Sequence, residues 1–434
     1  MKNKVIKILT MSVLICVVMV QSGCKKDYTD PNKAMEDDLF TNPTKAGLSG
    51  VATGLQRVYT LGRASNLYNH VTINGLVTNE LIVVNTGNTA EVQLAAGGTA
   101  VDGNHSMLTT FWTNLNKVIY DADKVITSAK TLGDKNFGSS LITYASIFKA
   151  LSIGDLSQFW EKVPASIGTS VSFIDRVDGF KKAITVIDEA LAAIAANPLS
   201  TSFSLYVPAG IDMVNTLHAL KARYSLFAGL YTQALTEANL VDLTKKSTFN
   251  FDALSLNPLY EVATSTNNVV QPKDSTLGLL VPLQPSLTDG RVPFYTSINA
   301  TISPRFRIKG FGDAAATAFP IYLPGEMMLI KAEAYARAAA PDLVNGTLEL
   351  NKVVTKNNDI YGVNANQPPA APATIAALLD EIYKNRCIEL FMSGLKLEDM
   401  RRFGRPTTER KRNLMPYPLR ERDNNPNTPP DPPF

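Results

Sequence analysis

Apolar side chains recur every three to four residues along several stretches of this chain, which is the pattern of a helix with one buried face. The pattern is clearest between residues 212 and 240, where Gly229 falls midway. A glycine there favours either one long helix or two helices joined by a tight turn. We predict helices over about 44–65, 111–125, 141–151, 178–195, 212–240, 324–340, 345–357 and 374–394. These stretches predict a mostly α-helical fold.

Two long stretches interrupt the helical pattern and are predicted to be irregular. Residues 66–108 are rich in Asn, Thr and Gly and show little periodicity, apart from a short strand expected at 80–84. Residues 243–320 are rich in Pro, Asn, Ser, Thr and Gly, with scattered aromatic residues. Because long non-helical regions in a compact protein are usually functional, a binding site is expected there.

The N-terminus has the pattern of a secretory signal peptide. Three lysines precede an apolar run from Ile8 to Val20, which is too short for a helix that spans a membrane. Cys24 follows directly after Ser22-Gly23 and resembles the lipidated cysteine of bacterial lipoproteins, although Gln21 departs from the usual Leu. We predict a signal peptide at 1–23, a lipidated Cys24 with a flexible tether at 24–43, and one domain at 44–434. An ordinary signal peptide with an incidental cysteine is the alternative.

Charge and cysteine content narrow the function further. Three of the 42 Lys and Arg lie in the signal peptide, which leaves 39 basic residues against 39 Asp and Glu. A neutral chain without a basic block gives no electrostatic basis for binding nucleic acid. With Cys16 removed and Cys24 lipidated, Cys387 stands alone and is expected to be a buried thiol.

Signatures of enzyme chemistry are missing from the sequence. It contains no His-Glu-x-x-His, no Gly-x-Ser-x-Gly and no phosphate-binding loop. Its only histidines are His70, His105 and His218, which makes a histidine metal cluster improbable. We therefore predict a protein with no catalytic residues, no cofactor and no metal.

Side chains suited to binding a sugar occur in both irregular stretches. Sugars are bound by aromatic faces that stack on the ring and by amides or charges that reach the hydroxyl groups. The candidates are Tyr68, Asn69, His70, Asn74 and Asn88 in the first stretch, and Asp289, Arg291, Phe294 and Tyr295 in the second. Ordinary loop packing is the competing interpretation for each of them.

The block from Asn385 to Gly404 places charged residues inside an apolar helical pattern. Its spacing predicts two ion pairs, one between Arg386 and Glu389 and one between Asp399 and Arg402. Gly394 would allow a close turn between two helices. A catalytic role for Glu389 and Asp399 is disfavoured, because a carboxylate beside a basic residue in such a block is far more commonly part of a structural ion pair.

Several segments together resemble the SusD/RagB family of outer-membrane nutrient-binding lipoproteins. They occur in the family's order along nearly the whole chain. They are the lipoprotein signal, Phe148-Lys-Ala-Leu with Phe159-Trp160 and Val163-Pro164, Ala219–Ala238, Pro320–Ala336, Asn385–Gly404, and Met415–Glu421 with Asn425-Pro426. The C-terminal block departs from the family pattern at Asn385 and Ser393, where the family usually has Glu, and at Lys396, where it usually has Arg.

The resemblance implies a scaffold of tetratricopeptide-like helix pairs with an irregular, ligand-facing half. It implies a lipid-anchored protein on the outside of the outer membrane that captures an oligosaccharide, or a peptide, and passes it to a SusC-like TonB-dependent transporter. No bond would be broken. Two other functions stay open at this point: a surface-anchored glycan hydrolase, and a tetratricopeptide-type scaffold that binds only protein.

Overall fold

The computed structural model of the protein describes residues 36–264 and 268–434. The chain divides into two units, with the boundary between residues 42 and 43. In the first unit, the described part is the short helix α2 (Glu36–Thr41). The predicted signal peptide and Cys24 lie outside the described residues. Within those residues, no helix is both long and apolar enough to cross a membrane.

The second unit is mostly helical, as predicted. Its α-helices are α3 (Lys45–Thr60), α4 (Asn66–Val77), α5 (Thr89–Ala96), α6 (Ser106–Ala129), α7 (Lys135–Phe159), α8 (Arg176–Ala196), α9 (Met213–Phe227), α10 (Tyr231–Leu240), α11 (Arg291–Tyr295), α12 (Pro324–Arg337), α13 (Leu343–Val354), α14 (Ile375–Glu389), α15 (Lys396–Arg402) and α16 (Leu419–Asn424). Shorter helical turns are η1 (Gly98–Ala100), η2 (Phe203–Leu205), η3 (Tyr260–Thr264), η4 (Gly310–Gly312) and η5 (Thr407–Glu409).

Short strands form two-stranded antiparallel pairs. The pairs are β1 (Leu81–Val83) with β5 (Val270–Pro272), β2 (Lys162–Pro164) with β3 (Phe173–Asp175), β4 (Thr248–Phe249) with β8 (Phe319–Pro320), and β6 (Thr296–Ile298) with β7 (Phe306–Ile308). Two of these pairs, β1 with β5 and β4 with β8, join segments that are far apart in the sequence, whereas β6 and β7 form a local hairpin within the irregular region.

Side-chain caps fix where many of the helices begin. The hydroxyl of Thr44 accepts the backbone N–H of Gly47 at the start of α3, and the carboxylate of Asp212 accepts that of Asn215 at the start of α9. Asp134, Asp342 and Thr374 do the same for α7, α13 and α14. Such caps satisfy N–H groups that have no partner within the helix.

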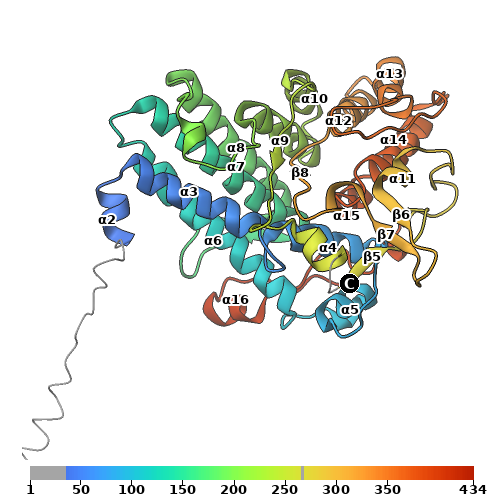
Figure 1. The fold of residues 1–434 in the computed structure, drawn as a ribbon, viewed down its shortest axis with the longest axis horizontal. Helices are drawn as coiled ribbons and strands as arrows, with labels where there is room; N and C mark the ends of the chain where they lie inside the picture. The colour runs from blue at the N-terminus through green and yellow to red at the C-terminus, as the bar shows by residue number, and fades with distance from the viewer. Residues whose placement is uncertain (1–35, 265–267) are drawn as a thin grey trace, which may run out of the picture. The chain divides into compact units, whose positions relative to one another are not determined.

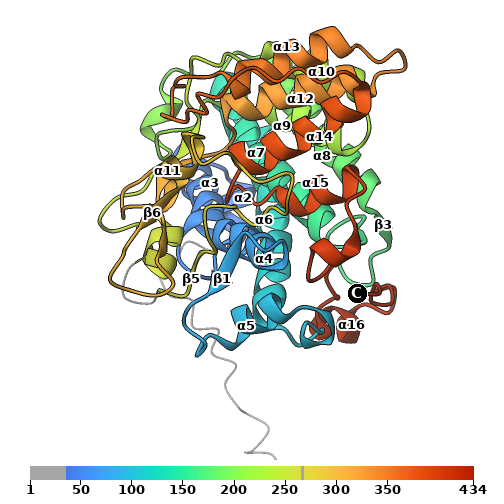
Figure 2. The ribbon, with the colours of Figure 1, turned by 90° about the vertical axis from the view of Figure 1, so that its right-hand side faces the viewer.

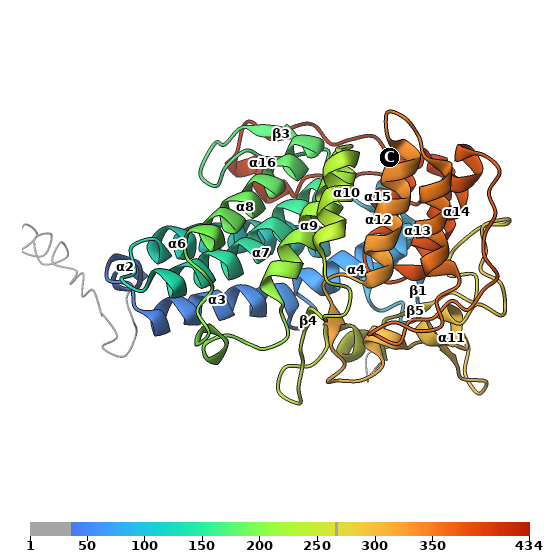
Figure 3. The ribbon, with the colours of Figure 1, turned by 90° about the horizontal axis from the view of Figure 1, so that it is seen from above.

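Successive helices pack against each other as pairs. Helix α7 packs on α6 and α8, α9 packs on α10, and α12 packs on α13 and α14. Figure 3 shows these helices side by side in a row that runs from α6, α7 and α8 through α9 and α10 to α12, α13 and α14. The predicted 212–240 helix is two helices, and Gly229 between them has a φ of 74°, which a residue with a Cβ rarely adopts.

The core lies between these helices. Phe148 and Trp160 are completely buried at the middle and end of α7, and Leu329, Leu350 and Ile382 form an apolar cluster between α12, α13 and α14. Cys387 is buried as expected, and burial raises the pKa of its thiol to about 12.

The irregular region 243–320 lies on one side of the helical row. Figures 1 and 2 show α11 and strands β5, β6 and β7 gathered there, next to α4 and α14. The other predicted loop, 66–108, is corrected by the structure, because it contains the helices α4 and α5. Helix α4 is buried on every side, and its polar residues are interspersed with the apolar ones, so its sequence has no periodic stripe that would reveal a helix. The strand expected at 80–84 is present as β1.

Candidate functional site

The pockets among the described residues include two that are lined in part by the irregular region. The first, which we term the aromatic pocket, has a volume of about 490 Å³ and is lined by Lys246, Asn250, Phe294, Lys309, Phe311 and Tyr361, among others. The second, which we term the proline pocket, has a volume of about 610 Å³ and is lined by Pro282, Asp289, Arg291, Pro368, Pro372 and Asn385, among others.

Strand pairing builds the aromatic pocket from distant segments. Strand β4 pairs with β8, which brings residues 246–250 beside residues 317 and 318. Strand β6 pairs with β7, and the backbone N–H of Lys309 donates to the carbonyl of Tyr295 at 3.0 Å beyond the last pair. Phe294 and Lys309 therefore meet at the same end of this hairpin.

Three half-buried aromatic rings form the wall of the aromatic pocket. Phe311 lies between the other two, with its ring centroid 5.4 Å from that of Phe294 and 5.9 Å from that of Tyr361. Both contacts are edge-to-face, the geometry that aromatic pairs favour. Each ring thus supports its neighbours while keeping part of its surface exposed.

Gly310 is required for the approach of η4 to this wall. Its φ is 59°, and a Cβ built there would lie 3.1 Å from the ring of Phe294 and 3.3 Å from that of Tyr295. Only glycine combines this left-handed conformation with so close an approach. The turn can then place Phe311 directly against Phe294.

Tyr361 is held firmly at both ends. Its hydroxyl donates to the carbonyl of Ser247 at 3.1 Å and accepts the N–H of Ser247 at 2.9 Å. Burial raises the pKa of its hydroxyl to about 12, so it stays a donor at neutral pH. At the backbone, the carboxylate of Asp359 accepts the N–H groups of Tyr361 and Val363 at 2.9 and 3.0 Å.

Polar side chains form the rim of the aromatic pocket. The ammonium of Lys246 lies 5.4 Å from the centroid of the Tyr361 ring, and that of Lys309 donates to the carbonyl of Pro293 at 3.1 Å. Asn250 is exposed and accepts the hydroxyl of Thr248 at 2.7 Å. The pocket thus offers aromatic surfaces beside donors and acceptors, which is the combination that binds a sugar.

The proline pocket has a different character. Its walls come from Pro282 and from the proline- and alanine-rich segment 368–373, while Asp380, Glu381 and Lys384 stand at the edge on α14. The buried side chains of Asp289, Arg291 and Asn385 line its floor. The walls of this pocket are small and apolar, and its edge is partly acidic. Its lining residues include no aromatic side chain.

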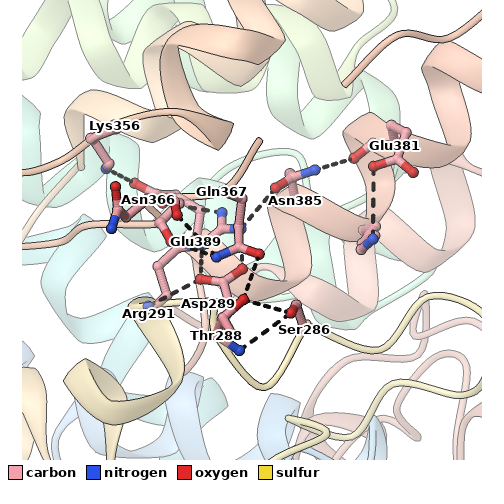
Figure 4. A network of polar contacts seen from close by, with 12 residues as sticks. Ser286, Thr288, Asp289, Arg291, Lys356, Asn366, Gln367, Glu381, Asn385 and Glu389 are labelled. Atoms are coloured by element: carbon pink, nitrogen blue, oxygen red, sulfur yellow. Dashed lines mark hydrogen bonds and ion pairs between the residues drawn. The ribbon is translucent and has the colours of Figure 1, made fainter. Parts of the chain in front are cut away.

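A buried network of charges supports the floor of the proline pocket (Figure 4). The guanidinium of Arg291 donates to both carboxylate oxygens of Asp289, at 2.9 and 2.7 Å, and to the amide oxygen of Asn385 at 2.8 Å. A further Nη of Arg291 lies 3.5 Å from the carboxylate of Glu389. Since Arg291 is only 1% exposed, the network is a structural element and not a free binding surface.

The same network reaches the aromatic pocket through Lys356. Its ammonium contacts the carboxylate of Glu389 and lies 2.7 Å from the carboxylate of Asp359. Asp359 in turn holds the backbone of Tyr361. One continuous chain of ion pairs and hydrogen bonds therefore joins the floor of the proline pocket to the wall of the aromatic pocket.

Comparison with known proteins gives a structural answer but no match by sequence. No protein-family model and no curated protein matches this chain. Solved structures do match over most of their length. A SusD superfamily protein from Bacteroides thetaiotaomicron has a TM-score of 0.71 at 15% identity, with 90% of this chain and 100% of that chain covered. One from Bacteroides vulgatus has a TM-score of 0.69 at 13% identity, with 90% and 99% covered.

The chain has the SusD fold. A third structure with this fold, a SusD-like carbohydrate-binding protein from Bacteroides fragilis, has a TM-score of 0.65 at 14% identity, with 84% of this chain and 87% of that chain covered. At these identities the likeness concerns the fold.

Within the SusD fold, four of the predicted ligand residues are buried in α4. Tyr68, Asn69, His70 and Asn74 are between 0 and 6% exposed, so they cannot reach a ligand from the surface. His70 lies 2.9 Å from the carboxylate of Asp155, and the amide of Asn74 donates to the carbonyl of Gly394 at 2.7 Å. Their polar groups make buried contacts within the protein, so the structure gives no support to the ligand role predicted for them.

The other predicted ligand residues are divided among different places. Phe294 lines the aromatic pocket, while Asp289 and Arg291 line the proline pocket as a buried ion pair. Tyr295 is buried, and its hydroxyl donates to the carbonyl of Glu389 at 2.5 Å. Asn88 precedes α5, where its amide donates to the carbonyl of Asn85 at 3.0 Å, and it lines neither pocket.

Sequence reasoning missed most of the aromatic pocket. Its other residues, Lys246, Asn250, Lys309, Phe311 and Tyr361, come from segments that only the folded chain brings together. Tyr361 lies outside both predicted insertions. The one signal available was the Gly310-Phe311-Gly312 sequence inside the aromatic-rich region, which marks a turn that carries an aromatic side chain.

The C-terminal ion network differs in part from the predicted pairs. Asp399 does pair with Arg402, at 2.6 Å. Arg386, however, pairs with Asp399 at 2.9 Å instead of Glu389, whose carboxylate belongs to the Lys356 and Arg291 network. The helical spacing of Arg386 and Glu389 would allow an ion pair, but each side chain pairs instead with buried partners from other segments. Among the described residues, no cluster of His, Cys, Asp or Glu is arranged to hold a metal.

Proposed function

We propose that this protein is a surface lipoprotein that binds glycan oligomers in the aromatic pocket. It would release them uncleaved to a SusC-like TonB-dependent transporter in the outer membrane. The observation that carries the proposal is the wall of three half-buried aromatic rings, Phe294, Phe311 and Tyr361, with amide and charged groups at its rim, in a chain with the SusD fold.

The dimensions of the aromatic pocket suit a short oligomer. A volume of about 490 Å³ falls in the range of small-molecule sites and accommodates a few sugar rings. Sugar rings present C–H faces that pack on aromatic surfaces, and their hydroxyl groups would reach Asn250, Lys246 and Lys309. A solved structure with this fold is described as a SusD-like carbohydrate-binding protein, which supports the glycan as ligand class.

Release of the glycan without cleavage is better supported than hydrolysis of the glycan. Glycoside hydrolases use two carboxyl groups on either side of the scissile bond. The lining of the aromatic pocket contains one carboxylate, Asp313, which accepts the hydroxyl of Thr317 at 2.7 Å. Glu389 and Asp399, the two carboxylates weighed from the sequence, are buried and ion-paired with basic side chains.

The sequence is the basis for including a lipid anchor and a transporter in this proposal. A lipid on Cys24 would keep the protein at the outer surface, close to the transporter that receives the ligand. A tether from residue 24 to about residue 43 would let the folded domain move while it stays attached. This arrangement explains why a binding protein needs an anchor.

A glycan array followed by analysis of the bound material tests the proposal. The purified protein should bind a subset of glycans, and mass spectrometry should recover them at their original length after prolonged incubation. Shortened products that disappear on mutation of a carboxylate would make it a hydrolase. Absence of binding to any glycan, together with capture of folded proteins by the helical face, would favour the scaffold alternative.

A further inference from the structure

We propose that the aromatic pocket selects glycans that carry a carboxylate or sulfate group, through the ammonium groups of Lys246 and Lys309. This inference rests on the proposed function, because it names the class of glycan that the same pocket would take. The observations that carry it are the placement of these two lysines, the state of the neighbouring carboxylate, and the contrast with the proline pocket.

The two lysines reach one pocket from separate segments. Lys246 precedes β4 and Lys309 follows β7, and both are exposed lining residues of the aromatic pocket. Within residues 36–264 and 268–434, neither ammonium forms an ion pair with a carboxylate. By contrast, the adjacent Lys245 points to Asp242, with 4.0 Å between the charged atoms.

Each ammonium group contacts a neighbouring protein group but has N–H donors left for a ligand. Lys246 lies over the ring of Tyr361, and Lys309 uses one donor on the carbonyl of Pro293. An ammonium has three donors, so Lys309 has two further N–H groups for a ligand. An anionic oxygen accepts such donors more strongly than a neutral hydroxyl does.

The pocket carries a net positive charge. Its lining holds two lysines and one carboxylate, Asp313, which is already engaged by the hydroxyl of Thr317. The proline pocket has the opposite balance at its edge, where Asp380 and Glu381 stand beside Lys384 alone. An anionic glycan would therefore be attracted to the aromatic pocket and repelled from the proline pocket.

Both the sugar ring and the anionic group of such a ligand would have a partner in the aromatic pocket. The sugar ring would pack against the exposed surfaces of Phe294 and Phe311. Its anionic group would lie at the rim, toward Lys309 on one side and Lys246 on the other. Because the aromatic wall reduces the contact with water, these charge pairs would be stronger than pairs on an open surface.

The test uses the full-length protein in detergent on an array that holds uronic-acid, sulfated and neutral oligosaccharides, including desulfated and carboxyl-reduced partners of the acidic ones. We expect the strongest ligands to be acidic and their neutral partners to bind at least about tenfold more weakly. The variants Lys246→Gln and Lys309→Gln should each lose affinity for the acidic ligand, and binding should weaken as salt is raised.

Lys384→Gln is the matched control, since it removes the same charge from the proline pocket and should leave affinity unchanged. Preference for uronic-acid ligands over sulfated ones, or the reverse, identifies the anionic group. Neutral glycans that bind as well as acidic ones, with no effect of the two lysine variants, would overturn the inference and leave the proposed function standing. Absence of binding to every glycan would overturn both.

Discussion

The ammonium of Lys356 lies 2.7 Å from the carboxylate of Asp359 and also contacts that of Glu389, so one buried cation joins two pockets. Asp359 holds the backbone of Tyr361 in the aromatic pocket, and Glu389 contacts Arg291 in the floor of the proline pocket. The two pockets are therefore connected through Lys356 and through Glu389 on α14.

Removing this cation should destabilise the protein strongly. In Lys356→Met, the carboxylates of Glu389 and Asp359 would lose a buried partner, which typically costs about 3–5 kcal/mol. Lys352→Met is the control, because Lys352 is about half exposed and pairs with Glu349 at 2.6 Å on the surface of α13. It should cost at most about 1 kcal/mol. Urea unfolding measures both, and equal losses of stability would contradict the structural role of Lys356.

The turn between α14 and α15 depends on the absence of a side chain at Gly394. Its φ is 78°, and a Cβ built there would overlap the ring of His70. Gly404 has a similar φ of 61° but meets no atom within 4 Å. Gly404→Ala should therefore cost about 1–2 kcal/mol for backbone strain alone, and Gly394→Ala should cost at least about 1–3 kcal/mol more because of the clash. Similar unfolding midpoints for the two variants would argue against the close contact.

Glu80 should make stability depend on pH. Burial raises the pKa of its carboxyl group from 4.5 to about 7, with Asp399 adding to the rise and Lys396 opposing it. A raised pKa means that the folded state binds more protons than the unfolded state between these two values. Stability from this group is therefore greatest below about pH 4.5 and falls as pH rises toward 7, by roughly 3 kcal/mol in total.

The substitution Glu80→Gln isolates the contribution of the Glu80 carboxyl group to stability. Among the described residues, neither carboxylate oxygen of Glu80 has a hydrogen-bond partner. Glu80→Gln cannot ionise, so its stability relative to the unchanged protein should improve between pH 5 and pH 8. Denaturant unfolding at the two pH values gives this difference. A relative stability that does not change with pH would mean that Glu80 keeps an ordinary pKa.

Cys24 should determine where the protein resides. Cys24→Ala should move the folded protein from the membrane fraction to the soluble fraction, because stable anchoring requires the acyl chains. Glycan binding should persist, since the pocket residues all lie between residues 246 and 361. Cys16→Ala changes another cysteine of the signal region and should leave the protein in the membrane. Fractionation with an antibody measures both, and a Cys24→Ala variant that stays in the membrane would rule out lipid anchoring at this residue.

The helical half of the fold was predictable because its helices are amphipathic and capped. The stripe of apolar residues through α9 and α10 predicted helical structure there, and the glycine between them left two helices as one of two options, which is the one that the structure has. Helix α4 was missed for the opposite reason, since it is surrounded by protein and its polar and apolar residues do not separate onto different faces. Its asparagines and histidine then suggested a loop with a binding role, although they are buried partners of Asp155 and the Gly394 turn.

The candidate site was less predictable than the fold. Phe294 could be selected as an aromatic residue in an irregular region, but its neighbours Phe311 and Tyr361 are placed by strand pairs and by the Asp359 turn. Arg291 and Asp289 have the composition of a ligand site, yet they neutralise each other inside the protein. Composition identifies side chains that could bind a sugar, whereas exposure decides which of them a ligand can reach, and exposure depends on contacts between distant segments.

The aromatic wall is the part of the account on which the proposed function depends. Phe294→Ala would remove one of its three rings, and the loss of such a packing surface is expected to weaken binding by about tenfold or more. Lys384→Ala alters the proline pocket instead and serves as the control. Both variants should first be shown to unfold at a urea concentration close to that of the unchanged protein.

Isothermal titration of the best array glycan into the unchanged protein and these two variants tests whether the aromatic pocket is the glycan site. We expect saturable binding without heat from turnover, an affinity at least about tenfold lower for Phe294→Ala, and an unchanged affinity for Lys384→Ala. Full affinity in Phe294→Ala, or a loss confined to Lys384→Ala, would contradict the assignment of the aromatic pocket as the glycan site.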